Sequence, residues 1–262
     1  MTPSPLIPSD NNLSIAWARA FLAVSELNKS VELSPLVVTV TDITDGVVNE
    51  HADIRNALDT QLLSARKQSC HTVANTIFPS SLWNANKIDG GADLFSRFER
   101  TWPKIHQFPA NSKGHYFRRM TAYEPAGSPK SVNQLEHITC TFNKKNHRRS
   151  ALQAAIFDPT RDHNHSRIGR FPCLHQVAFL PLESNGLCVT AFYPMHYLFE
   201  RAYGNYLGLC RLGKFMAVNM GLKFTQLVCV SSVAKLDDQV SKNAVSGLRK
   251  ELARILAVKD GK

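Results

Sequence analysis

The chain has 262 residues, of which 44% are hydrophobic and 20% charged, and its formal net charge is +10. Length and composition predict one globular α/β domain over residues 1–262 with a sizeable core. No apolar run approaches the length of a membrane span, and the first ten residues lack the basic and apolar regions of a signal peptide. We therefore expect a cytoplasmic protein that does not bind a membrane and that begins with a flexible tail over residues 1–12.

Six cysteines are spread along the chain without a C-x-x-C pair. This spacing favours reduced thiols over a disulfide framework or a zinc site, so no metal is expected. Positive charge gathers in segments such as 144–149 and 161–167, which fits either a nucleic-acid surface or a solvated face with an anion pocket. Because no zinc-finger or RNA-recognition signature accompanies these segments, nucleic acid is the less favoured partner.

Hydrophobic periodicity predicts the elements of the first half of the chain. In order they are a helix over 12–27, a strand over 36–41, a helix over 54–67, a short apolar turn within 71–83 and a helix over 94–102. The last of these should end before Pro103, because proline disrupts a helix interior. Residues 108–130 hold several prolines and glycines and predict loops.

The second half begins with a predicted helix over 133–143 and a buried strand over 150–157 that ends at Asp158. The remaining elements are a hairpin with arms 175–182 and 187–193, a long helix over 197–220 that stops at Gly221, a strand over 227–233 and a helix over 245–258.

One stretch carries the residues that suggest chemistry. Cys173 follows a proline directly, with Arg170 and His175 close in sequence, and the basic pair Arg148 and Arg149 lies about two dozen residues upstream. A thiolate adds to electron-poor double bonds, neighbouring cations lower its pKa, and paired guanidinium groups bind phosphate in a bidentate fashion. These residues therefore suit an electrophilic small molecule that carries a phosphate.

Each of these residues also has a plainer interpretation. Cys173 could be a small buried hydrophobic residue, as Cys188, Cys210 and Cys229 are expected to be. A basic pair usually belongs to a solvated turn, and an asparagine such as Asn205 could be an amide on a helix surface.

The order of these pieces resembles the thymidylate synthase and pyrimidine nucleotide hydroxymethylase superfamily, over about residues 110–240. The matching segments are residues 114–119 (GHYFRR), residues 133–135 (NQL), residues 146–150 (NHRRS) with the strand to Asp158, the Pro172–Cys173 pair, Leu187, Phe199 and Asn205. The first hundred residues match the family poorly.

The resemblance implies a thymidylate-synthase-like α/β (α+β) fold, with a large mixed sheet that is flanked by helices and packs at a two-fold dimer interface. Cys173 would add to C6 of a pyrimidine nucleotide monophosphate and make C5 nucleophilic toward a one-carbon unit on a folate. Arg148 and Arg149 would reach the nucleotide phosphate of the partner subunit, and Asn205 would read the edge of the base.

Several positions depart from the family pattern. Leu174 replaces the histidine that follows the cysteine, and Pro194 and Met195 replace an arginine–serine pair that binds phosphate. Tyr197 replaces an aspartate used with folate, and Arg201 replaces a glycine. The ribose-binding positions fall on Lys235 and Asp237, and the C-terminal segment that closes over folate differs.

We therefore predict a divergent transferase of this superfamily that acts at C5 of a pyrimidine nucleotide, by methylation, hydroxymethylation or another exchange. Its substrate residues would be Arg148, Arg149, Asn205, His175 and Arg170. Folate is implied by the resemblance, but its binding residues are altered. The alternative is a catalytically inactive nucleotide-binding or scaffold protein that keeps the homodimeric fold.

Overall fold

The computed structural model describes residues 9–25, 32–87, 89–111, 114–125, 130–145, 147–163, 165, 171–237, 241–259 and 261. Nine α-helices are assigned in this part of the chain: α1 (Leu13–Ser25), α2 (Ala52–Ser64), α3 (Cys70–Ile77), α4 (Gly90–His106), α5 (Tyr116–Thr121), α6 (Gln134–Asn143), α7 (Pro159–Asp162), α8 (Tyr203–Met220) and α9 (Lys242–Lys259). The strands are β1 (Leu36–Val40), β2 (Gln153–Ala155), β3 (Gln176–Pro181), β4 (Gly186–Tyr197) and β5 (Lys223–Lys235).

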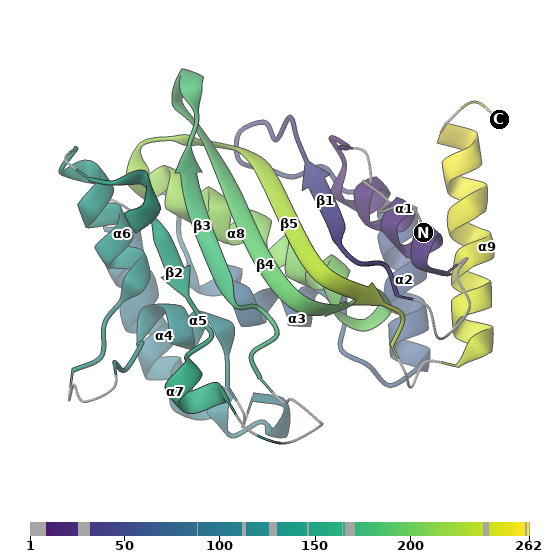
Figure 1. Ribbon diagram of the computed structural model, residues 1–262, viewed down its shortest axis with the longest axis horizontal. Coiled ribbons are helices and arrows are strands. Elements are labelled where there is room, and N and C mark those ends of the chain that lie inside the picture. Colours follow the sequence, from purple (N-terminus) through teal and green to yellow (C-terminus); the bar gives the residue numbers. More distant parts are fainter. Residues whose placement is uncertain are drawn as a thin grey trace.

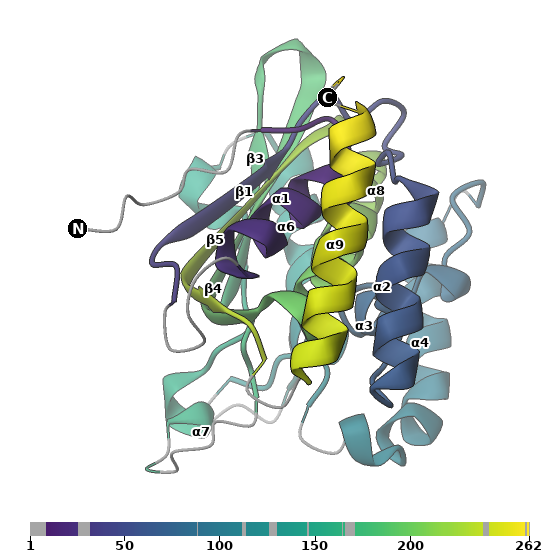
Figure 2. The same cartoon turned by 90° about the vertical axis from the view of Figure 1, so that its right-hand side faces the viewer.

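The strands form one mixed sheet in the order β1-β5-β4-β3-β2. Only β4 and β5 are parallel among these neighbours, and α8 makes the crossover between them. In Figure 1 the sheet faces the viewer, with α8 and α3 behind it, and Figure 2 shows α1, α2, α8 and α9 together on one side. The expected mixed α/β architecture, a mixed sheet flanked by helices, is confirmed.

The two faces of the sheet differ because side chains alternate along each strand. The row Val177, Ala191, Cys229 and Val38 crosses the sheet beneath the helices, and all four residues are buried. Neighbouring rows point the other way and consist of Ala178, Thr190, Val228 and Thr39, and of Gln176, Phe192, Val230 and Val37. None of these eight residues is buried and none is charged. The sheet thus has one packed face and one uncharged, partly apolar face.

Helix α8 lies at the centre of the core, and most of its residues are buried. It contacts α3 at short range because glycines face that helix: a Cβ at Gly204 would lie 2.5 Å from the Cβ of Val73, and one at Gly208 would lie 2.7 Å from the Ala74 carbonyl. Gly221 ends α8 in the left-handed conformation, as the sequence predicted. Two buried side chains tie α1 to this region, since Ser14 bonds the Tyr203 hydroxyl and Trp17 donates to the Leu198 carbonyl.

Several predicted boundaries were wrong. Helix α4 continues through Pro103 to His106, because Trp102 and Ile105 still pack against the core on its inner side and offset the hydrogen bond that proline removes. The turn expected within 71–83 contains helix α3, and the loop-rich segment 108–130 contains α5. The predicted strand over 150–157 keeps only Gln153–Ala155, because residues 149–151 form a 3₁₀ turn.

The remaining expectations for the first half of the chain and for the hairpin hold within a few residues. Of the expected N-terminal tail, residues 1–8 lie outside the described residues, whereas Asp10 pairs with the sheet through the backbone of Thr39 and Thr41. Among the described helices, none has the length and apolarity needed to cross a membrane.

Candidate functional site

A cavity of about 310 Å³ opens beside Cys173. We call it the Cys173 pocket. Its lining comes from distant parts of the chain and includes Gln68, Val73, Thr76, Asn111, Gly114, His115, Tyr116, Phe171, Cys173, Met195, His196, Tyr197, Glu200, Arg201 and Asn205. The residues from α3, the end of β4 and α8 meet because α8 packs closely on α3 and because β4 runs directly into α8. A π-helical turn at Leu198–Ala202 makes the connection from β4 to α8. Such turns aim side chains that a regular helix would direct elsewhere.

The wall around Tyr116 depends on one glycine. Gly114 has a φ of +144°, and a Cβ at this position would stand 2.4 Å from the Phe171 ring. Phe171 stacks on Tyr116 with ring centroids 5.2 Å apart. The Arg119 guanidinium carbon lies over the Phe171 ring, 5.3 Å from the ring centroid. Arg119 is held in turn by an ion pair of 2.7 Å with Asp162. Arg119 is therefore structural support for the wall.

Cys173 is exposed, unlike the buried Cys188, Cys210 and Cys229. Desolvation by the surrounding protein raises the pKa of its thiol, and two groups act in the opposite direction: the positive charge of Arg201 and a hydrogen bond from Tyr116. Arg201, which the sequence did not suggest as a neighbour of this thiol, is the cation that lowers its pKa, and desolvation outweighs the two favourable groups. Without a ligand the thiol is neutral, and Arg201 and Tyr116 are positioned to stabilise the thiolate when it forms.

Tyr116 is oriented toward Cys173 by the backbone. The amides of Cys173 and Leu174 bond its phenol oxygen, while burial raises the pKa of the phenol above its ordinary value. The phenol is therefore a neutral hydrogen-bond donor at physiological pH. Arg201 is fixed from two sides, by an ion pair of 2.8 Å with Glu200 and by a hydrogen bond of 3.0 Å to Gln68 Oε1.

Asn205 is buried at the inner end of the pocket and is held by His196. The Asn205 Nδ2 lies 2.9 Å from His196 Nε2, and His196 Nδ1 lies 3.1 Å from Ser231 Oγ. Burial lowers the pKa of His196 to about 3, so the ring is neutral at physiological pH. Because an amide nitrogen can only donate, His196 Nε2 accepts, and Nδ1 carries the proton and donates to Ser231.

This chain of bonds fixes which way the Asn205 amide faces. His196 takes one amide N–H, which leaves the carbonyl oxygen and the second N–H of Asn205 for other partners. Parallel stacking of His196 on Tyr193, with centroids 4.1 Å apart, keeps the imidazole in place. Asn205 thus brings a hydrogen-bond acceptor and a donor to the lining of the pocket.

Of the expected substrate and catalytic residues that the structure describes, Cys173 and Asn205 line the same pocket. The His175 ring stacks on Phe157 with centroids 4.4 Å apart and does not line the pocket. Arg170 lies outside the described residues. Tyr116, Arg201 and His196 are the contributors that sequence reasoning missed: Tyr116 was visible only within the segment 114–119, and Arg201 was noted only as a departure.

The arginine pair lies elsewhere in this chain. Arg148 and Arg149 are exposed, and Arg149 donates to the carbonyl of Pro181 at 2.7 Å. Pro181 ends β3, whereas Cys173 precedes it, so roughly 20 Å of strand separates the two regions. Within a single chain, these arginines and Cys173 cannot contact the same small ligand.

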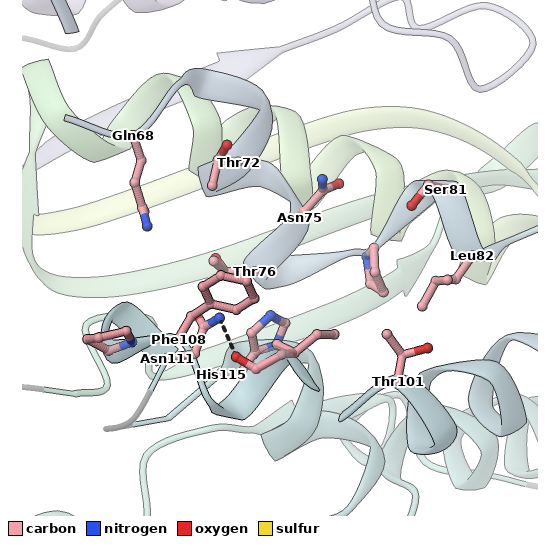
Figure 3. Close-up of a pocket in the computed structure, with 13 residues that line it drawn as sticks. Gln68, Thr72, Asn75, Thr76, Ser81, Leu82, Thr101, Phe108, Asn111 and His115 are labelled. Atoms are coloured by element: carbon pink, nitrogen blue, oxygen red, sulfur yellow. Dashed lines mark hydrogen bonds between the residues drawn. The ribbon is translucent and has the colours of Figure 1, made fainter. Parts of the chain in front are cut away.

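A second cavity, of about 470 Å³, adjoins the Cys173 pocket between α3 and α4 (Figure 3). We call it the α3–α4 pocket. The two cavities share Gln68, Thr76, Asn111 and His115. The rest of its lining is Thr72, Asn75, Pro79, Ser81, Leu82, Thr101, Ile105, Phe108 and Pro109. Among these described residues there is no lysine, arginine, aspartate or glutamate.

A folate does not fit this lining. Its glutamate carboxylates would need cations, and the amino edge of its ring system would need a buried carboxylate. The described lining of the α3–α4 pocket offers neither. No cluster of three or more potential metal ligands occurs among the described residues. The sequence matches no protein-family model and no curated protein.

Proposed function

We propose that this protein is a divergent enzyme of the thymidylate-synthase kind, in which Cys173 forms a covalent adduct with a pyrimidine nucleotide monophosphate and the chemistry occurs at C5. The observation that carries the proposal is a single pocket in which an exposed thiol is bonded by Tyr116 and lies near the charge of Arg201, with the Asn205 amide in the same lining. This combination supports a nucleophile and a base reader in one site.

The proposed step begins when the Cys173 thiol loses its proton to solvent as the nucleotide binds. The thiolate sulfur forms a bond to C6 of the ring, the C5–C6 π bond breaks, and the electron pair moves to C5 and its conjugated carbonyl oxygen. Tyr116 and Arg201 stabilise the thiolate before it attacks, because each favours the charged form of the sulfur. C5 then forms a bond to a one-carbon electrophile and releases its proton to solvent, and the C5–C6 double bond re-forms as the sulfur leaves C6.

The edge of Asn205 supports a uracil ring over a cytosine ring. Uracil offers an N–H donor at N3 beside a carbonyl acceptor, which complements an acceptor beside a donor. Cytosine has an acceptor at N3 and a donor at its amino group. With the ring held in the same place by the bond from Cys173 to C6, the amide would have to rotate to match cytosine and would break the bond to His196. We therefore propose a uridylate substrate.

A homodimer would supply the phosphate site. The uncharged face of the sheet, with Leu180 and Phe192 each more than a third exposed, suits burial against a second copy. Arg149 lies at the end of β3 on this sheet, and a nucleotide phosphate bound by the arginine pair would belong to a ligand in the partner's pocket. The free thiols of the chain are compatible with a reducing, cytoplasmic location.

One observation favours the alternative of an inactive nucleotide-binding protein: the raised pKa of the Cys173 thiol, which disfavours the nucleophilic form at rest. The test is incubation with 5-fluoro-deoxyuridylate and deoxyuridylate, followed by intact mass measurement. We expect a mass increase of one nucleotide with wild type and none with Cys173→Ala. Cys188→Ala is the matched control, because that buried thiol should leave the adduct unchanged.

Binding without an adduct would favour the inactive alternative. It would appear as a nucleotide-dependent rise in melting temperature that Cys173→Ala retains. If no pyrimidine nucleotide produces either a mass increase or a melting shift, the proposed function is wrong.

A further inference from the structure

The α3–α4 pocket is lined by a buried histidine, His115, whose Nδ1 has no hydrogen-bond partner among the described residues. His115 is 5% exposed, and desolvation lowers the pKa of its ring to about 4, so the imidazole is neutral at physiological pH. Its Nδ1 is sealed from solvent and has no hydrogen-bond partner. Of the two ring nitrogens, only Nε2 could meet a ligand in the cavity that His115 lines. Figure 3 places His115 on the floor of the cavity beside Phe108 and Asn111. His115 therefore contributes a neutral imidazole to the cavity wall, with Nε2 as the group that could hydrogen-bond a ligand.

Two amides at the junction of the cavities are held in fixed orientations. Arg201 bonds Gln68 Oε1, which leaves the Gln68 nitrogen to extend into the cavity, as Figure 3 shows. Asn111 Nδ2 donates to the Ile105 carbonyl at 3.0 Å, which leaves its oxygen available. These amides and His115 place polar groups at the end of the pocket nearest to Cys173.

Much of the remaining lining is apolar. It includes Leu82, Ile105, Phe108, Pro79 and Pro109. The threonine hydroxyls in the wall are bonded within the protein, as Thr76 and Thr101 each donate to a backbone carbonyl of their own helix. A charged group placed here would lose its hydration and find no opposite charge among the described lining residues.

We propose that the α3–α4 pocket binds an uncharged second ligand, with a hydrogen-bonding end against His115 and Gln68 and an apolar body against Leu82 and Phe108. The cavity of about 470 Å³ is large enough for a molecule with one or two rings. Its polar end would lie at the junction with the Cys173 pocket. Its role as a co-substrate rests on the function proposed above, whereas the binding itself does not.

The test uses three probes that share one ring and differ in charge: benzyl alcohol, benzoate and benzylamine. Each is titrated into the full-length protein and followed by ligand-observed NMR, with and without deoxyuridylate. We expect the alcohol to bind at least about tenfold more tightly than either charged probe, because only the ions lose hydration without compensation. Nucleotide should not displace it.

Two variants locate the bound alcohol. Ser81→Trp places a large ring in the α3–α4 pocket from an exposed position, and His115→Phe removes the nitrogen while keeping a ring of similar size among Phe98 and Trp102. Both should weaken alcohol binding several-fold, and the melting temperature of each variant confirms folding. Cys173→Ala is the matched control and should bind the alcohol as wild type does.

The proposal is overturned if a charged probe binds as tightly as the alcohol, if neither variant weakens alcohol binding, or if no alcohol binds. A wild type that binds the alcohol but no pyrimidine nucleotide would support this pocket and contradict the proposed function.

Discussion

The two pockets share a wall and differ in charge. The Cys173 pocket holds an exposed thiol with Glu200 and Arg201 in its lining, whereas the described lining of the α3–α4 pocket is neutral. Gln68 joins the two, since Arg201 bonds one end of its amide and the other end extends into the neutral cavity. The comparison shows that ionic groups are confined to the side where a charged ligand and a thiolate would need them.

The largest expected effect is the loss of both pockets together. Gly208→Val should reduce the free energy of unfolding by about 3 kcal/mol or more, because its side chain would collide with the Ala74 carbonyl and Ile77 of α3. Urea denaturation measures this change. The matched control is Gly247→Ala on the exposed part of α9, where a Cβ meets nothing within 4 Å. That control should be neutral or stabilise by about 0.5–1 kcal/mol. Equal stability of Gly208→Val and wild type would contradict the close packing of α3 on α8.

The next effect tests base recognition in the Cys173 pocket separately from ligand binding in the α3–α4 pocket. His196→Ala should lower the preference for deoxyuridylate over deoxycytidylate by about tenfold, because the Asn205 amide becomes free to rotate. Calorimetric titration with each nucleotide gives the ratio. Ser231→Ala keeps the imidazole and should have a smaller effect, and benzyl alcohol binding should not change in either variant. An unchanged ratio in His196→Ala would mean that the imidazole does not orient the amide.

A smaller change is expected at the thiol. Tyr116→Phe removes the hydrogen bond that favours the Cys173 thiolate, so the pKa of the thiol should rise further and its alkylation by iodoacetamide at pH 8 should slow by roughly threefold to tenfold. The rate is measured against pH in a background where Cys140, the other exposed cysteine, is serine. A shift of the rate profile to lower pH would contradict this role.

The smallest effect concerns the carboxyl group of Asp237, which accepts a hydrogen bond from the backbone of Glu200 in the Cys173 pocket. Burial and the nearby Glu200 raise the pKa of Asp237 to about 7, although the Glu200 backbone amide donates to its Oδ2 and Lys67 acts in the opposite direction. Because the folded pKa lies above the unfolded one, this group contributes stability below about pH 4 that is lost as pH rises through 7.

Asp237→Asn should therefore flatten the fall in stability between pH 5 and 8 and raise the free energy of unfolding at pH 8 by about 1 kcal/mol. Thermal unfolding across this range measures it. A variant whose stability falls with pH as steeply as that of wild type would show that another group titrates.

Much of the fold follows from local pattern. The alternation of apolar residues predicted the β3–β4 hairpin, and Gly221 marked the end of α8, because these signals act within a few residues. The order of motifs suggested Cys173 and Asn205 as residues of one site, and both line the Cys173 pocket. Pro103 misled the prediction because the packing of Trp102 and Ile105, a tertiary effect, outweighs a local preference.

The rest of the site depends on geometry that a linear pattern does not contain. Arg201 faces Cys173 only because a π-helical turn precedes α8, and His196 reaches Asn205 only because β4 continues for four residues beyond the predicted end of the hairpin. The α3–α4 pocket lies between α4 and α3, a helix that was expected to be a turn.

The position of β1 has a consequence for how the chain folds. Leu36 pairs with Ser231, roughly two hundred residues later in the sequence. During synthesis, β1 must wait as an unpaired, β-branched segment until β5 leaves the ribosome. Such long-range pairing slows folding and exposes an aggregation-prone strand. We expect nascent chains released before residue 223 to need chaperones, and strand β5 to be the step that commits the molecule to its native topology.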